Sequence, residues 1–383
     1  MMRKVLKSTC IVLSFCFLLQ TNVNAQNEAE YGKLVNIIPT AVPFLSIAPD
    51  SRAGGMGGVG VATPNDVYAQ FWNPAKYAFV ETNLGFGLAF TPWLRHLIGD
   101  INLYTLTGVY RLDEWQGISA SIRYFSIGEI TFRTSYDDMG YTVSPNEFSI
   151  DLAYNRRLSD NFAGSVAFRY IRSDLQIGVA ADGFQPGNSF AADLSFYYQT
   201  EADFIGPNSK ISSGINISNI GSKISYDGVN KEFIPTNLRL GASVYTELDA
   251  HNSMVFSVDV NKLLVPTPGV PGEGETSEEY RNKYNSMGTI KGMWQSFSDA
   301  PGGFKEEMQE INACLGVEYW YEKQFAIRAG YYHEHKLKGN RKHFTGGLGL
   351  KFNMLTIDAS YIIAVNQSNP LANTIRVSIA MDF

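Results

Sequence analysis

From Leu84 to Phe383, apolar and polar residues alternate along the chain with a period of two. Because successive side chains of a strand point to opposite faces, this pattern predicts strands with one apolar face and one polar face. The same alternation is present in residues 148–155, 254–261 and 355–363. In the last segment the apolar positions are Ile375, Val377, Ile379, Met381 and Phe383, and the positions between them are Arg376, Ser378, Ala380 and Asp382.

About fourteen such segments follow one another, and most have the ~9–11 residues that a tilted membrane strand needs. An even number is what a closed antiparallel barrel with both termini on one side requires. The pattern therefore predicts an all-β fold, a transmembrane antiparallel β-barrel of about 14 strands. The strands are expected to begin near Leu84, Ile101, Gly117, Glu147, Phe162, Phe190, Lys210, Asn237, Ser253, Ile311, Phe325, Lys342, Met354 and Asn373.

The connections between these segments alternate in length. Every second one is short, and those between them are longer and richer in Gly, Pro and Asn, as in residues 176–188, 221–235 and 264–310. Outer-membrane barrels combine short periplasmic turns with long outer loops. With Phe383 at the periplasmic end, the alternation predicts that every long loop lies outside the cell. The short connections are residues 112–115, 158–161, 248–251, 321–324 and 352–353.

Residues 26–82 precede the alternating region and have a different character. They contain several prolines and a glycine cluster, and they lack strand alternation. Lipid offers no hydrogen-bond partners, so a closed sheet is needed to pair the backbone groups. The lumen of a barrel of about 14 strands is wide enough to let solutes leak through unless it is filled. We therefore expect residues 26–82 to form a hatch inside the barrel of residues 83–383.

Residues 1–25 have the parts of a secretory signal peptide: a basic start, the apolar run 10–19, and small residues before a cut after Ala25. The apolar run is too short to span a bilayer, and no later stretch of about 18 apolar residues follows. Together with the barrel pattern, this predicts the outer membrane of a Gram-negative bacterium. The formal net charge of −6 leaves no basic surplus for binding nucleic acid.

The glycine cluster formally matches the dinucleotide motif G-x-G-x-x-G over residues 55–60. No strand precedes it and no βαβ unit encloses it, so we reject a nucleotide site. The favoured interpretation is tight turning of the backbone against the inner barrel wall, where side chains do not fit. The glycines concerned are Gly54, Gly55, Gly57, Gly58 and Gly60.

The histidines are candidate metal ligands. His333 and His335 would share one strand face, and His343 would begin the next strand, so a three-histidine site is conceivable. No fourth ligand is evident, which favours rim residues near lipid headgroups and water. Cys314 is the single cysteine after the signal peptide, and we expect it to be a buried, unreactive packing residue.

No Ser–His arrangement or acid–base pair of carboxylates is recognisable either. We therefore expect no catalytic residue, no metal and no cofactor, and we predict that the chain is not an enzyme.

The turn Asn73-Pro74-Ala75 is rigid, because Pro74 fixes φ and the side chain of Asn73 can bond the backbone. Placed before a barrel, it resembles the hatch of FadL-like outer-membrane proteins. Longer strings resemble one family more specifically: APDSRAGGMG at 48–57, WNPAKYA at 72–78, SFSDAPGGF at 296–304 and EYWY at 318–321. They are similar to PorV, the FadL-like outer-membrane component of the type IX secretion system of Bacteroidota.

The resemblance, which extends from the hatch to the C-terminus, implies a non-enzymatic function. Proteins of this family receive cargo by its C-terminal signal domain at the large outer-membrane translocon barrel. They pass it to the surface attachment complex and its sortase. Outer-membrane lipid would surround the barrel. The terminal Phe383 resembles the signal that the outer-membrane insertion machinery reads. The alternative is a FadL-like transporter of hydrophobic small molecules.

The long connection 264–310 offers a surface for such partners, because loops of this length are usually functional or disordered. Its apolar residues are of the kind that anchor protein interfaces. A lid that packs on the barrel mouth is the alternative, and both roles are compatible. The candidate partner-binding residues are Met287, Met293, Trp294, Phe297 and Phe304.

Overall fold

The computed structural model describes residues 36–94, 99–133, 139–176, 184–269, 276–365, 371 and 373–383 of the 383-residue chain. The expected signal peptide, residues 1–25, and the first residues of the expected mature chain lie outside the described residues.

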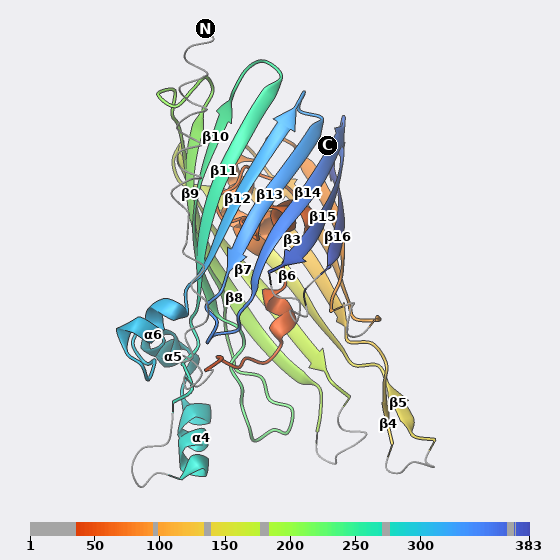
Figure 1. Ribbon diagram of the computed structural model, residues 1–383, viewed down its shortest axis with the longest axis vertical. Helices are drawn as coiled ribbons and strands as arrows, with labels where there is room; N and C mark the ends of the chain where they lie inside the picture. The colour runs from red at the N-terminus through yellow and green to blue at the C-terminus, as the bar shows by residue number, and fades with distance from the viewer. Residues whose placement is uncertain are drawn as a thin grey trace. The chain divides into compact units, whose positions relative to one another are not determined.

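Fourteen antiparallel strands form one closed barrel, in which β1 pairs with both β2 and β16 (Figure 1). The strands are β1 (Leu84–Pro92), β2 (Asn102–Arg111), β3 (Gln116–Ser126), β6 (Asn146–Arg157), β7 (Phe162–Asp174), β8 (Gly187–Glu201), β9 (Lys210–Gly221), β10 (Asn237–Glu247), β11 (Asn252–Leu263), β12 (Asn312–Tyr321), β13 (Phe325–His333), β14 (Lys342–Phe352), β15 (Leu355–Ala364) and β16 (Ile375–Asp382).

The predicted fold class is confirmed, and each strand begins within three residues of its expected start. The largest difference is β8, which begins at Gly187 rather than near Phe190. Its first residues have weak alternation because Gly187 adds no side chain to the pattern. Pairing with β7 nevertheless continues from Phe190 to Gly187.

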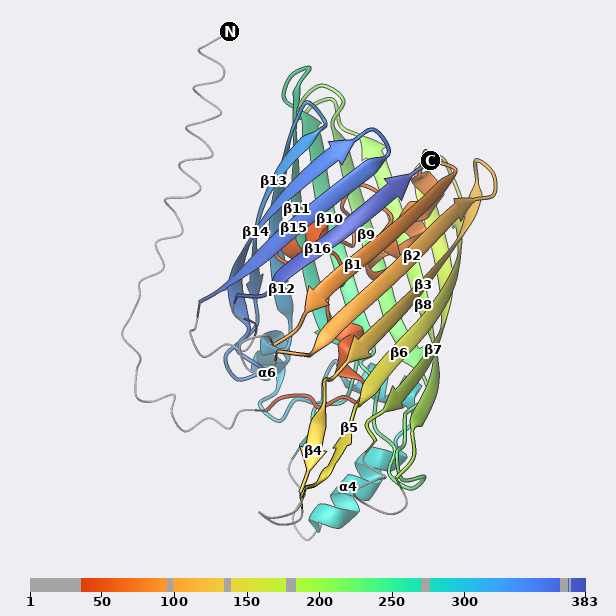
Figure 2. The ribbon, with the colours of Figure 1, turned by 90° about the vertical axis from the view of Figure 1, so that its right-hand side faces the viewer.

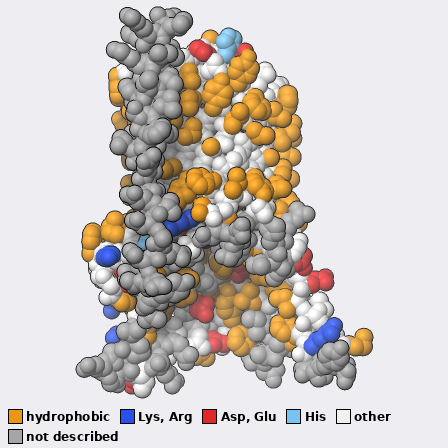
Figure 3. All heavy atoms as spheres, in the orientation of Figure 1, with side chains coloured by type: hydrophobic (Ala, Val, Ile, Leu, Met, Phe, Trp, Pro, Cys, Tyr) orange, Lys and Arg blue, Asp and Glu red, His pale blue; other side chains and the backbone are white. Residues whose placement is uncertain are grey.

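The two faces of the wall differ as the alternation requires. In β3, Ile118, Ile122 and Tyr124 are exposed on the outer face, whereas Ser119 and Arg123 are buried on the inner face. Large hydrophobic side chains are exposed on strand after strand around the barrel, and Figure 3 shows them across the wall. Backbone groups are paired in the sheet, so this surface suits contact with lipid.

The connections are sorted by length between the two ends of the barrel (Figures 1 and 2). We call these the long-loop end and the short-turn end. Within the short set, residues 202–209 are longer than the sequence pattern suggested. The short turns are residues 112–115, 158–161, 202–209, 248–251, 322–324 and 353–354, and the long connections are 93–101, 127–145, 175–186, 222–236, 264–311, 334–341 and 365–374.

Two long connections carry secondary structure that the alternation did not predict. Strands β4 (Ile130–Phe132) and β5 (Tyr141–Val143) pair as a small hairpin beyond the barrel. The connection after β11 contains the short helices α4 (Ser277–Ser286), α5 (Thr289–Gln295) and α6 (Phe304–Gln309). Among the helices of the described residues, none is both long and apolar enough to cross a membrane.

The N-terminal segment forms a plug inside the barrel, where Figure 2 shows it between the walls. Its elements are the 3-10 helices η2 (Pro43–Ser46) and η3 (Pro74–Phe79) and the helices α2 (Ser51–Gly55) and α3 (Ala69–Trp72). Nearly every side chain from 50 to 79 is buried. Helix α2 contacts β13 to β16, and η3 contacts β6, β7 and β8 on the other side of the lumen. The core of the molecule therefore lies between plug and wall.

Candidate functional site

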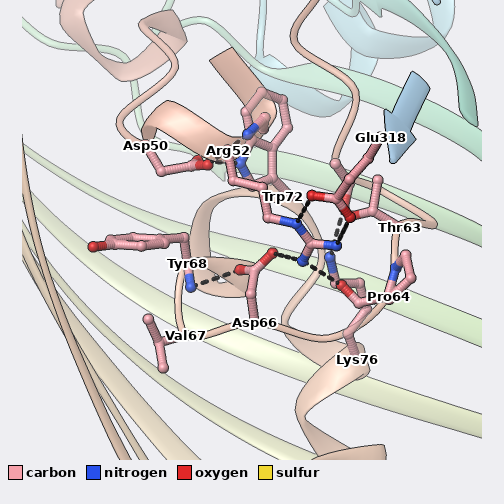
Figure 4. Close-up of polar contacts among 12 residues, drawn as sticks. Asp50, Arg52, Thr63, Pro64, Asp66, Val67, Tyr68, Trp72, Lys76 and Glu318 are labelled. Atoms are coloured by element: carbon pink, nitrogen blue, oxygen red, sulfur yellow. Dashed lines mark hydrogen bonds and ion pairs between the residues drawn. The ribbon is translucent and has the colours of Figure 1, made fainter. Parts of the chain in front are cut away.

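The plug is joined to the wall by a buried network of ion pairs centred on Arg52 (Figure 4). The Arg52 guanidinium group bonds both oxygens of Glu318 on β12, with Nη2 2.8 Å from Oε1 and Nε 3.0 Å from Oε2. Its Nη1 donates to Asp66 Oδ2 at 2.7 Å and to the carbonyl of Pro64 at 2.9 Å. A bidentate, charge-assisted contact of this kind fixes orientation as well as distance.

Within the wall the network continues from Glu318 to neighbouring strands. Arg328 on β13 donates from Nε to Glu318 Oε2 at 2.6 Å and from Nη1 to Asp358 Oδ1 on β15 at 2.6 Å. Glu318 therefore lies between two arginines and Arg328 between two carboxylates. Removing one partner would leave a buried charge uncompensated, which is strongly destabilising.

Asp50 holds two parts of the plug together. One carboxylate oxygen accepts a hydrogen bond from the backbone N of Ala53 at 2.8 Å and so caps helix α2. The other accepts from Nε1 of Trp72 at 2.7 Å. Since Trp72 ends helix α3, this single carboxylate fixes α2 against α3.

The glycine cluster makes the turn between α2 and the rest of the plug. Gly57 and Gly58 have φ of +74° and +83°, a conformation that side chains disfavour. A Cβ atom at Gly57 would lie 2.7 Å from the backbone N and O of Tyr331 on β13. At Gly60 it would lie 2.3 Å from the indole of Trp72. The backbone here approaches both the wall and the plug more closely than a side chain allows.

The other two glycines of the cluster also face the wall. A Cβ atom at Gly54 would lie 2.9 Å from Nη1 of Arg376, and at Gly55 it would lie 3.0 Å from the Cα of Gly347. The backbone of Gly60 and Val61 then donates to Asp259 Oδ2 on β11, at 2.7 and 3.0 Å. The cluster thus meets backbone, an arginine and a carboxylate of the wall.

The turn Asn73-Pro74-Ala75 starts η3 and is fully buried. The Asn73 side-chain oxygen accepts from the backbone N of Ala75 at 3.1 Å. Its Nδ2 donates to the carbonyl of Val61 at 3.1 Å and to that of Phe196 on β8 at 2.9 Å. Asn73 therefore caps the helix, joins two parts of the plug and bonds the wall.

Arg123 on β3 holds the first part of the plug segment, the 3-10 helix η2, in place. Its Nη2 donates to the carbonyls of Phe44 at 2.9 Å and Ile47 at 2.7 Å, and its guanidinium group lies 5.7 Å from the Phe44 ring. The carbonyl of Ile47 follows the 3-10 helix η2, and that of Phe44 also accepts a hydrogen bond from the backbone N of Ile47.

The sequence analysis did not single out Arg52, Glu318, Arg328 or Arg123. The alternation identifies Glu318, Arg328 and Arg123 only as polar residues that face inward. The sequence around each of them does not indicate which residue it pairs with. Charged residues at inward positions were nevertheless a usable signal, because a charge at membrane depth needs a partner. Buried Lys76 was missed as well; its Nζ donates to the carbonyl of Gly60 at 2.8 Å and to Thr63 Oγ1 at 3.0 Å.

The histidines do not converge. His333 ends β13, and His335 lies in the following connection rather than on the strand, which corrects the shared face expected from the sequence. His343 pairs with Tyr332 in the sheet and stacks on it inside the barrel, whereas His333 faces outward. Within the described ranges, no three His, Cys, Asp or Glu side chains are grouped as metal ligands.

Helix α6 is held to the long-loop end by buried ion pairs. Lys262, near the end of β11, bonds Glu307 Oε2 at 2.9 Å and Glu310 Oε2 at 2.6 Å. Lys338, from the β13–β14 connection, bonds Glu306 at 2.6 Å and Glu310 Oε1 at 3.0 Å. Two lysines of the barrel thus face three carboxylates around α6.

The side of α5 and α6 away from the network exposes large apolar residues. Trp294 is 76% exposed and Phe304 is 81% exposed. The apolar patch, as we call it, comprises Ile290, Trp294, Phe297, Phe304 and Met308. Ile290 and Trp294 are four residues apart on α5, as are Phe304 and Met308 on α6, so each pair lies on one helix face.

The structure separates the five candidate partner-binding residues into two groups. Trp294, Phe297 and Phe304 belong to the apolar patch, whereas Met287 and Met293 are half-buried. Ile290 and Met308 are exposed and were not expected. Only helical spacing would have identified them, and the connection was interpreted as a loop.

Phe383 completes the seam between the first and last strands. Its backbone N donates to the carbonyl of Leu84 at 2.8 Å, and its own carbonyl accepts from Asn83 at 2.9 Å. The ring is half exposed, at 51%, on the outer face of the short-turn end. An aromatic ring in this position suits the interfacial zone of a bilayer.

Comparisons with known proteins agree with this description. The family model of the type IX secretion system protein PorV matches residues 30–270, more than half of the chain. A search of curated proteins finds no match.

Solved structures with similar folds include the P. putida toluene transporter TodX, with a TM-score of 0.51 and 12% identity over 87% of this chain and 98% of that one. A Pseudomonas aeruginosa FadL homologue has a TM-score of 0.46 and 13% identity over 91% and 99%. At such identities the likeness to TodX concerns the fold alone.

Proposed function

Because this chain belongs to the PorV family of type IX secretion system proteins, we propose that it binds the C-terminal signal domain of exported cargo at the translocon. It then delivers the cargo to the surface attachment complex and its sortase. The protein is an outer-membrane β-barrel of a Gram-negative bacterium. In this proposal the long-loop end faces the cell exterior, where cargo emerges and is attached.

The observation that carries the proposal is the apolar patch on α5 and α6. Interfaces are anchored by large aromatic side chains, and Trp294 and Phe304 are almost fully available for such contacts. The buried ion pairs of α6 and the close packing of Gly292 on α5 hold the patch in place, so binding does not have to order the helices first. A rigid apolar surface beyond the membrane suits a protein partner.

The plug supports the same function. The plug fills the lumen, and its ion pairs and close backbone contacts with the wall hold it in place. A carrier that hands over folded protein on its loops needs no path through the barrel. We propose that the chain acts by binding alone and has no catalytic turnover.

The alternative function is transport of hydrophobic small molecules through the barrel, which would need an exit through the wall or past the plug. One register shift interrupts the strand pairing, between Ala192 and Leu194 on β8. The Asp193 carboxylate lies there, accepting from the backbone N of Asn219 at 2.7 Å and pairing with Arg169 at 3.0 Å. The shift is therefore occupied by a polar network, which does not favour an apolar exit.

We expect the double variant Trp294→Ser and Phe304→Ser to insert normally but to lose partner binding. The measurement is recovery of the large translocon barrel, the sortase or uncleaved cargo in a pull-down from detergent-solubilised outer membrane, together with surface attachment of cargo. Recovery should fall at least about tenfold, since two interface anchors are removed.

The matched control is Phe204→Ser, because Phe204 is 84% exposed in the β8–β9 turn at the short-turn end. It should bind partners as the wild type does. Unchanged attachment of cargo in the double variant would show that the patch is not the partner surface. Uptake of a hydrophobic small molecule that depends on this protein would instead support transport.

A further inference from the structure

A cavity of about 140 Å³ lies between the plug and the barrel wall. From the plug it is lined by residues near Ile47 and by Gly54, Gly57 and Gly58. From the wall it is lined by residues at the starts of β10, β12, β14 and β16 and at the ends of β11, β13 and β15. These strand ends all belong to the long-loop end. A cavity of this size has room for several water molecules or one small ion.

The cavity is unusually cationic for its size. Three arginines line it, namely Arg239, Arg341 and Arg376, and none of the described residues around it is Asp or Glu. Arg341 is balanced, because its guanidinium group bonds both oxygens of Glu334, at 2.6 and 2.8 Å. In the described part of the chain, no ion pair balances Arg239 or Arg376.

Arg376 is the strongest pointer to a ligand. It is 95% buried, since only 5% of it is exposed, and its Nε has no hydrogen-bond partner among the described residues. The nearby carboxylate of Asp50 already accepts from Trp72 and Ala53. Gly54 adjoins the Arg376 guanidinium group and, lacking a side chain, leaves it room.

Arg239 has only weak partners on the opposite side of the cavity. Its Nη1 donates to the carbonyl of Phe71 at 3.2 Å, and its guanidinium group lies over the rings of Phe71 and Trp72 at 4.4 and 5.0 Å. Its Nε faces the side-chain oxygen of Asn237, an amide that also lines the cavity. These groups are neutral, and the carboxylates of Asp259 and Asp193, which favour the charge of Arg239 at longer range, form no ion pair with it among the described residues.

A buried charge without a counter-charge is costly, and an anion in the cavity would remove that cost. Guanidinium groups match the oxygens of carboxylate and phosphate groups in particular. The cavity also presents the side-chain oxygens of Asn261 and Asn312, neither of which has a donor among the described residues. An anion that carries an O–H group as well as acceptor oxygens satisfies both kinds of group.

We propose that this cavity binds a phosphate group, in its hydrogen phosphate form, between Arg376 and Arg239. The charged oxygens accept from the two arginines, and the O–H donates to an amide oxygen. This site lies apart from the apolar patch, and the inference does not depend on the proposed secretion function.

The test uses the purified full-length mature protein in detergent, with chloride as the background anion. Trp72 and Trp93 line the cavity, so tryptophan fluorescence reports its occupancy. Inorganic phosphate should give a saturable change in fluorescence and raise the thermal midpoint of unfolding. Acetate, which has no O–H at neutral pH, should bind at least about tenfold more weakly.

Arg376→Gln should weaken phosphate binding at least about tenfold, because a charge-assisted contact is lost. Without phosphate it should raise the thermal midpoint, since it removes a buried charge, whereas loss of a merely structural arginine would lower it. Arg172→Gln is the matched control; Arg172 is partly exposed near the rim on β7 and should not matter.

Four results would overturn the proposal. Three are the absence of a saturable response to phosphate, equal affinity in Arg376→Gln, and binding of acetate as tight as that of phosphate. The fourth is a response to palmitate alone, because it would indicate a hydrocarbon site.

Discussion

Glu318 shows how much a single buried residue decides in this barrel. It is fully buried on β12, and its carboxylate bonds Arg52 of the plug and Arg328 of the wall. Buried ion pairs add little stability compared with apolar packing, but they are costly to break singly. Here the ion pairs position the plug on the wall, because they join a plug residue to a strand that follows it by more than 260 residues in the sequence.

The glycine turn gives a sharp prediction at the same scale. Gly57→Ala should destabilise the protein by more than Gly58→Ala. Both changes place a side chain at positive φ, at about 1–2 kcal/mol, but at Gly57 the Cβ also meets strand backbone at 2.7 Å. At Gly58 the nearest atom is 3.9 Å away. The measurement is the temperature at which the folded barrel unfolds, followed by electrophoresis of unheated and heated samples.

Gly346→Ala is the control, because a Cβ there has no neighbour within 4 Å among the described residues and φ is not positive. Its effect should stay within about 0.5 kcal/mol. If Gly57→Ala and Gly58→Ala were equally mild, close contact between plug and wall would not matter for stability.

At the scale of elements, α5 and α6 depend on the barrel for their structure. Helices of six or seven residues are not stable alone in water. Here the ion pairs of Lys262 and Lys338 fix α6, and Gly292 of α5 packs closely against Pro266 and Phe233. The apolar patch is therefore positioned by the strands next to it.

Asp299, between these helices, makes their docking depend on pH. Burial raises the pKa of Asp299 from 3.8 to about 6, with a further contribution from Glu307 and Glu310 and opposing contributions from the backbone N of Thr267 and from Lys262. Since the docked state holds the proton more tightly, its stability is highest at low pH and falls as pH rises from about 4 to about 6. Protection of α5 and α6 amides from hydrogen exchange should thus be greater at pH 5 than at pH 7, after correction for intrinsic rates.

Asp299→Asn cannot ionise, so its protection should change less over this range and should exceed that of the wild type at pH 7. An unchanged pH dependence in this variant would show that Asp299 is not the group responsible.

At the scale of the whole molecule, the closed sheet and the plug solve different problems. The sheet pairs the backbone where lipid cannot, and its continuity leaves no edge. The plug fills the lumen that closure of fourteen strands creates. Ion pairs between the plug and charged residues that face the lumen bind the two parts together. Without the barrel, the charges of the plug segment would lie in water.

The wild-type protein in a planar bilayer should therefore show no steady ion conductance. Glu318→Gln should produce transient openings, because it leaves Arg52 and Arg328 without their shared carboxylate and loosens the plug. Glu114→Gln, in an exposed turn, is the control and should remain closed. A steady open-pore conductance of the wild type would contradict a plug that fills the lumen.

The sequence by itself determined the number of barrel strands, their approximate starts and their inner and outer faces. Strand periodicity is local, and lipid enforces it at every second residue, as in β16 from Ile375 to Met381. The family strings in residues 48–57 and 72–78 lie in the plug, where tight turns restrict which residues fit.

Only the tertiary structure decided which inward charges meet. The pairing of Arg52 with Glu318, and the arginines left unpaired around the cavity, depend on how strands and plug are stacked in space. Helix α6 was likewise hidden, because contacts with β11 and the β13–β14 connection stabilise it rather than its own sequence. Alternation tells whether a residue faces the lumen, but not what it meets there.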